Sequence, residues 1–74
     1  MEFSELYNIT LSDMVSDYHM LEMELERLVN SDMNVSDKVE QIKLTLNKIA
    51  VLELAMGKWQ ILNPNNNEDK EEED

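Results

Sequence analysis

Apolar residues recur at helical spacing in two long segments of the chain, which a short polar stretch separates. In the first segment they stand alternately three and four residues apart from residue 11 to residue 28, the heptad seam of a helix that packs against another helix. Thr10, with Asp13 three residues later, resembles a capping box at a helix start. We therefore expect a first helix over about residues 11–30, with a seam of Leu11, Met14, Tyr18, Leu21, Leu25 and Leu28.

The polar stretch NSDMNVSD, residues 30–37, predicts a turn, because Asn, Asp and Ser side chains bond to the local backbone. Either Asn34, with Asp37 following, or Ser36 can cap the second helix. This helix is expected over about residues 35–62 and ends before Pro64, since the residue before a proline avoids the helical region. Its seam slips by one residue near Glu53 and consists of Val39, Ile42, Leu46, Ile49, Leu52, Met56 and Trp59.

Two helices joined by a short turn predict an all-α fold, an antiparallel two-helix hairpin of the coiled-coil kind. Residues 1–10 are either an N-terminal arm or an extension of the first helix, and residues 63–74, with six acids in the last seven positions, are expected to be a disordered acidic tail. A chain of 74 residues without cysteine has a small core and no disulfide to support it. We therefore expect self-association or a partner to complete the hairpin to a bundle.

A second apolar stripe lies on the opposite side of the second helix. At about 100° per residue, Leu44, Val51, Ala55 and Leu62 fall within roughly 40° of one another and away from the seam. One antiparallel neighbour covers one stripe of a helix but not two. The sequence therefore predicts a partner interface at Leu44, Val51, Leu54, Ala55, Ile61 and Leu62.

Charge narrows the range of partners. The formal net charge is −11, from 17 acidic and 6 basic residues, whereas nucleic acids and anionic membranes select clustered Lys and Arg. We expect a cytoplasmic protein that binds a protein partner or its own copies, with no direct nucleic-acid or membrane binding. Residues 1–34 carry a net charge of −7 and residues 35–62 one of +1. Met20 and Met23, on the acidic first helix, are either gap-fillers or an adaptable contact surface.

The sequence offers no recognisable catalytic chemistry. A chain with one glycine has no glycine-rich phosphate loop, and no zinc-protease motif, EF-hand spacing or activated nucleophile occurs. His19 is expected to be solvated. The carboxylates of Glu22 and Glu26, one helical turn apart, are typical of a solvent-facing helix. We expect no enzymatic activity, no cofactor, no metal site and no small-molecule substrate.

The segments MVSDYHMLEMELERL and KVEQIKLTLNKIAVLELAM, with the polar turn between them, resemble a known family. These are the small cytoplasmic helical hairpins that act as co-chaperones of type III secretion needle subunits. The resemblance covers residues 6–62. It implies a helical hairpin that binds a helical-repeat chaperone and helps to hold an aggregation-prone needle subunit.

The sequence is compatible with three functions. The first is an adaptor or chaperone subunit, for example one of a secretion system, whose second helix binds a partner helix. The second is an acidic inhibitor that mimics nucleic acid, as small phage-encoded proteins do. The third is a structural protein that only self-associates into a four-helix dimer.

Overall fold

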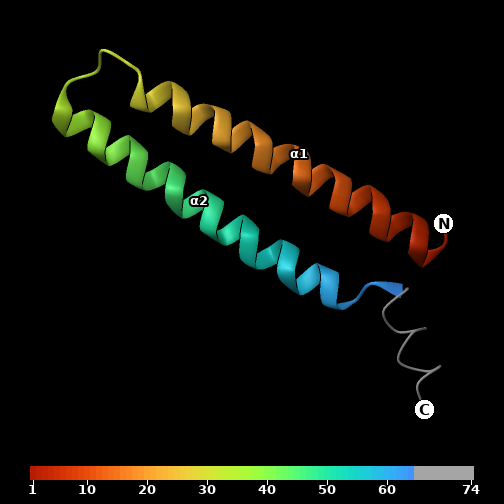
Figure 1. Cartoon of the computed structure of the whole chain (residues 1–74). Helices are drawn as coiled ribbons and strands as arrows, with labels where there is room; N and C mark the ends of the chain where they lie inside the picture. Colours follow the sequence, from red (N-terminus) through yellow and green to blue (C-terminus); the bar gives the residue numbers. More distant parts are fainter. Residues whose placement is uncertain (65–74) are drawn as a thin grey trace.

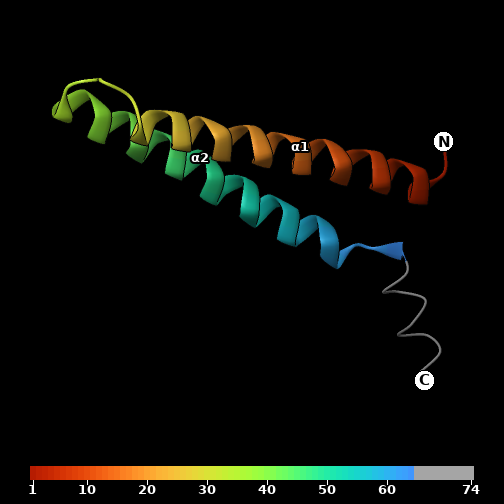
Figure 2. The ribbon, with the colours of Figure 1, turned by 45° about the horizontal axis from the view of Figure 1, so that its top comes forward.

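The computed structural model describes residues 1–64, which form two α-helices of equal length. Helix α1 spans Phe3–Val29 and helix α2 spans Val35–Ile61, with 27 residues in each. The two helices lie side by side and antiparallel (Figure 1), and the turned view in Figure 2 agrees. The all-α hairpin expected from the sequence is confirmed. The acidic tail expected over residues 63–74 falls outside the described residues from residue 65 onward.

Helix α1 begins eight residues before the expected start at residue 11. Of the two alternatives for the N-terminal residues, the structure has the helix extension. No glycine or proline interrupts this segment, and Tyr7 continues the heptad seam one step before Leu11. Thr10 therefore lies inside the helix, partly buried, and not at its N-terminus. Glu5 occupies the first turn, where a negative charge is favourable near the helix dipole.

An aromatic cluster closes the end of the hairpin that carries the N-terminus. Tyr7 is buried, and its ring stacks on that of Trp59 at a centroid distance of 5.5 Å. Phe3 meets the same indole edge-on at 6.0 Å. The Trp59 Nε1–H also donates a hydrogen bond of 3.2 Å to the Tyr7 carbonyl oxygen. The first turns of α1 therefore cover the last turn of α2, and the indole N–H has a partner in this contact.

Hydrogen bonds at the helix ends hold the turn at the other end. The Asn34 side chain caps α2 by accepting from the Asp37 backbone N–H at 2.9 Å, and its amide donates to the Asp37 carboxylate. The Lys38 ammonium donates to the Ser31 carbonyl oxygen at 2.9 Å, and the Ser31 hydroxyl donates to the Leu28 carbonyl oxygen at 2.8 Å. Of the two expected caps, the structure uses Asn34. The backbone groups that each helix leaves unpaired at the turn are thus partly satisfied.

The seam of α2 differs from the expected one in its first half. Val39 and Leu46, expected in the hairpin core, are 50% and 47% exposed, whereas Thr45 is buried. The residues turned toward α1 keep an unbroken three-and-four spacing, so no slip near Glu53 is needed: they are Lys38, Ile42, Thr45, Ile49, Leu52, Met56 and Trp59. The expected seam followed the most apolar residues. The one observed includes a lysine and a threonine that find hydrogen-bond partners.

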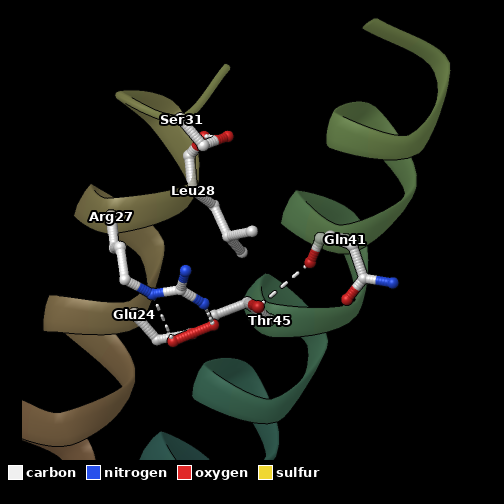
Figure 3. Close-up of polar contacts among 6 residues, drawn as sticks. All are labelled: Glu24, Arg27, Leu28, Ser31, Gln41 and Thr45. Atoms are coloured by element: carbon white, nitrogen blue, oxygen red, sulfur yellow. Dashed lines mark hydrogen bonds and ion pairs between the residues drawn. The ribbon is translucent and has the colours of Figure 1, made fainter. Parts of the chain in front are cut away.

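Thr45 can be buried because its hydroxyl bonds within its own helix. The hydroxyl donates to the Gln41 carbonyl oxygen at 3.0 Å, one turn earlier. Figure 3 shows Thr45 on α2 across from Leu28, which projects from α1 into the space between the helices. The Gln41 carbonyl lies within the helix and also serves the backbone ladder. No other group therefore depends on the Thr45 hydroxyl for a hydrogen bond, and an apolar side chain can replace threonine at this position.

The substitution Thr45→Val should raise the free energy of unfolding by about 0.5–1.5 kcal/mol, because a methyl replaces a hydroxyl opposite Leu28. Leu46→Thr, the reverse kind of change one residue away, should cost less than about 1 kcal/mol because Leu46 is half exposed. Urea denaturation at one fixed protein concentration measures both. If Thr45→Val lowered the free energy of unfolding and Leu46→Thr lowered it by more than about 2 kcal/mol, Leu46 and not Thr45 would lie in the interior.

Candidate protein-interaction surface

Most of the hairpin seam is only half-buried. In the described chain, Tyr7, Leu28 and Thr45 are buried, whereas the seam residues Leu11 and Ile49 are half-buried. This follows from the architecture, because each side chain of a two-helix pair meets one neighbouring helix and has water on its flanks. The hairpin therefore leaves much apolar surface uncovered, and large exposed apolar surfaces mark sites of interaction.

The outer face of α2, the side turned away from α1, is apolar and exposed. The helical repeat of about 100° per residue places all six predicted interface residues on this half of α2. Val51 is 67% exposed and Ile61 is 69% exposed. The full set, each member classed as exposed, is Leu44, Val51, Leu54, Ala55, Ile61 and Leu62. The structure thus brings the predicted residues together on one surface, which we call the outer face of α2.

Two polar residues complete a regular seam on this face. Asn47 and Lys58 fall between the apolar positions, so that the steps from residue 44 to residue 61 alternate between three and four. The seam is Leu44, Asn47, Val51, Leu54, Lys58 and Ile61. The prediction from apolar residues alone missed Asn47 and Lys58, although both stand at the three-and-four spacing that defines the seam. The outer face of α2 therefore has the pattern of a second coiled-coil contact.

Small residues border this seam. Ala50, Ala55 and Gly57 lie beside it, and all three are exposed. A Cβ atom built on Gly57 meets no other heavy atom within 4 Å, so the space beyond it is open within the hairpin. Small residues at such positions let a neighbouring helix approach closely.

A shallow groove runs between the two helices along one edge of the outer face. Its α2 wall includes Lys48, Val51 and Ala55, and its α1 wall includes Asp17 and Met20. Met20 thus adjoins the predicted interface, which favours the contact-surface alternative for this side chain. Met23, which follows Met20 by three residues, lines a neighbouring hollow with Met20, Glu24 and Arg27, and is 69% exposed.

The charges of the two helices differ sharply. Helix α1 carries six acidic residues and one basic residue, whereas α2 carries three acidic and four basic residues. On α1, Arg27 forms an ion pair with Glu24 (Figure 3), and this hydrogen bond lowers the pKa of the Glu24 carboxyl, with a smaller contribution from Lys48 of α2. The outer face of α2 is therefore the part of an acidic molecule that does not carry a net negative charge.

Glu53, which broke the expected apolar seam, makes a polar contact between the helices. The Tyr18 hydroxyl donates to the Glu53 carboxylate at 3.0 Å. This hydrogen bond, together with the negative charge, raises the pKa of the Tyr18 phenol, because it favours the neutral donor. The folded state therefore gains stability from this pair at pH values below the ordinary tyrosine pKa of about 10 and loses it as the pH rises through the raised value.

Glu53→Gln should lower the pKa of Tyr18 toward about 10, since the amide accepts a weaker hydrogen bond and carries no charge. Glu22→Gln should produce a smaller decrease, because Glu22 acts on the phenol through its charge alone. Titration of the tyrosine ring carbons by ¹³C NMR gives both values. Equal shifts in the two variants would contradict the hydrogen-bonded pair.

The polar side chains of the described residues form no further candidate site. His19 contacts the Glu22 carboxylate at 3.4 Å on the exposed surface of α1. Residues 1–64 contain no cluster of three or more His, Cys, Asp or Glu side chains arranged to hold a metal ion. Over the same residues, neither helix has the length and apolar character needed to cross a membrane. The outer face of α2 is the feature on which a functional interpretation can rest.

Comparison with known proteins finds no family model, no curated protein and no solved structure that matches this chain.

Proposed function

We propose that this protein is a non-enzymatic interaction module that binds a protein partner through the outer face of α2. The observation that carries the proposal is the exposed seam from Leu44 to Ile61, with coiled-coil spacing, on the side of α2 that α1 does not cover. Helix-in-groove recognition uses anchors of this type at this spacing. The partner therefore supplies an apolar helix or a groove between helices.

Energetics support a covered outer face. Full burial of a Val, Leu or Ile side chain contributes about 1.5–3 kcal/mol. Val51, Leu54 and Ile61 are each more than 60% exposed in the isolated hairpin, so most of that contribution is unused. A chain of 74 residues without disulfides has a total stability of only about 3–5 kcal/mol. Covering three such side chains therefore changes its stability by an amount comparable to the whole.

An adaptor or chaperone subunit is the role that suits such a surface best. An inhibitor that mimics nucleic acid relies on an ordered array of carboxylates, and the apolar face of α2 contributes nothing to it. Six of the 17 acidic residues also stand in the last seven positions, beyond the described part of the chain. The more specific role, a co-chaperone of secretion needle subunits in the cytoplasm, stays a prediction.

A photoreactive amino acid placed at position 51, in cells of the source organism, tests the proposal. The outer face of α2 should cross-link to a protein, because a bound helix lies within van der Waals contact of this position. The matched control is position 23, since Met23 and Val51 are exposed to nearly the same extent, 69% and 67%, on different helices. Mass spectrometry of the adducts identifies the protein that is bound.

The expected result is a discrete adduct from position 51 and only background from position 23. The same adducts in similar yield from both positions would show that exposure alone determines cross-linking, and the proposal would then be rejected.

A further inference from the structure

We propose that the occupant of the outer face of α2 is a second copy of this chain, with the two α2 helices packed antiparallel about a two-fold axis. The inference rests on the proposed function, since it names the partner of the same surface. Two independent observations select a second copy: the order of residues along the seam, and the distribution of charge between the helices.

The seam on the outer face reads the same in both directions when residues are classed as apolar or polar. From residue 44 to residue 61 the order is apolar, polar, apolar, apolar, polar, apolar. An antiparallel pair centred between residues 52 and 53 therefore matches every apolar residue with an apolar one. The pairs across the axis are Leu44 with Ile61, Asn47 with Lys58, and Val51 with Leu54 of the second copy.

The polar pair also suits this arrangement. The Asn47 side-chain carbonyl oxygen can accept a hydrogen bond from the Lys58 ammonium of the second copy, so neither group is left unpaired at the contact. A polar residue at a single core position is a known means of setting the register and orientation of paired helices. In a parallel arrangement Lys58 meets Lys58, and the two like charges repel.

Charge places α2 and not α1 at the interface between copies. A molecule with a net charge of −11 repels its own copies over most of its surface. Helix α2 carries four basic against three acidic residues, a net charge of only +1, so two such helices repel each other far less than two acidic α1 helices would. The outer face of α2 points away from α1, and pairing through it leaves the acidic α1 helices on the two outer sides of the dimer. The arrangement therefore separates the charges that repel most strongly.

The neighbouring residues permit close packing of the two helices. Ala50 lies on one flank of the seam and Ala55 on the other, and both side chains end at Cβ, so each flank of the contact includes a small side chain. Gly57 has open space around it in the hairpin, and it shares its flank of the seam with Ala50 of the second copy. Such a contact remains consistent with the interaxial distance of about 8–10 Å that packed helices adopt.

The solution mass is the first test. Light scattering across a concentration series should give twice the chain mass of 8.7 kDa, with dissociation on dilution. Val51→Glu should give a helical monomer at concentrations where the wild type is a dimer, because two buried carboxylates meet near the axis. Met23→Glu, the control of matched exposure, should remain a dimer. A wild type that stays monomeric, or an equal loss of the dimer in both variants, would overturn the inference.

Cysteine cross-linking tests the register and does not depend on a destabilising variant. The chain contains no cysteine, so Asn47→Cys and Lys58→Cys can each be made as a single thiol and mixed before mild oxidation. The mixture should form mainly the mixed disulfide. Each variant alone should form little, because the two equivalent positions lie 11 residues apart along the axis, about 16 Å, beyond the Cα separation of about 7 Å that a disulfide tolerates.

Efficient self-cross-linking of either single variant, without preference for the mixed product, would show a parallel arrangement or random collision and would refute the antiparallel pairing.

The two proposals fail in different ways. If position 51 cross-links in cells to a different protein while the purified chain is monomeric, the outer face binds a partner but the second copy is rejected. If position 51 cross-links in cells only to a second copy of the chain and the purified chain is a dimer through α2, the self-contact stands and the adaptor function is rejected.

Discussion

Within residues 1–64 each helix packs against one other helix, and that constraint explains most of what the structure shows. A helix pair can enclose only the residues directly between its members, so even the side chains that face the other helix keep some contact with water. Tyr7, Leu28 and Thr45 are the buried exceptions among the described residues. The hairpin consequently depends on its two ends, where aromatic stacking and capping hydrogen bonds fix the helices. The same constraint leaves the outer face of α2 without cover in the hairpin, and the proposed interaction surface is a consequence of the architecture.

The hairpin could be predicted from the sequence because both helices carry long apolar repeats and the residues between them favour a turn. Which residues of α2 face α1 could not be predicted in the same way. Leu46 is more apolar than Thr45, and hydropathy alone selects it for the core. Burial of Thr45 depends on a hydroxyl bonded to the Gln41 carbonyl oxygen and on the position of Leu28 across the hairpin. These contacts depend on how the two helices pack, and the spacing of apolar residues in one helix does not determine them.

The residue at which α1 begins also could not be predicted from the local sequence around it. Thr10 and Asp13 have the spacing of a helix cap, yet the helix passes through them, because Phe3 and Tyr7 gain contacts with Trp59 only when the early residues are helical. Tertiary packing thus outweighs the capping preference. The apolar members of the candidate surface were accessible from their spacing, since exposed positions on α2 follow directly from the helical repeat. Asn47 and Lys58 were not recognised because a search for hydrophobic residues passes over polar members of a seam.

The contact of Trp59 with the first turns of α1 has a spectroscopic consequence. This is the one tryptophan of the chain, and its indole both stacks on Tyr7 and donates a hydrogen bond to the Tyr7 carbonyl oxygen. Its fluorescence therefore reports on the end of the hairpin far from the turn, whereas circular dichroism averages over both helices. Comparison of the two signals during unfolding distinguishes fraying of that end from separation of the whole pair, and it does so without any label.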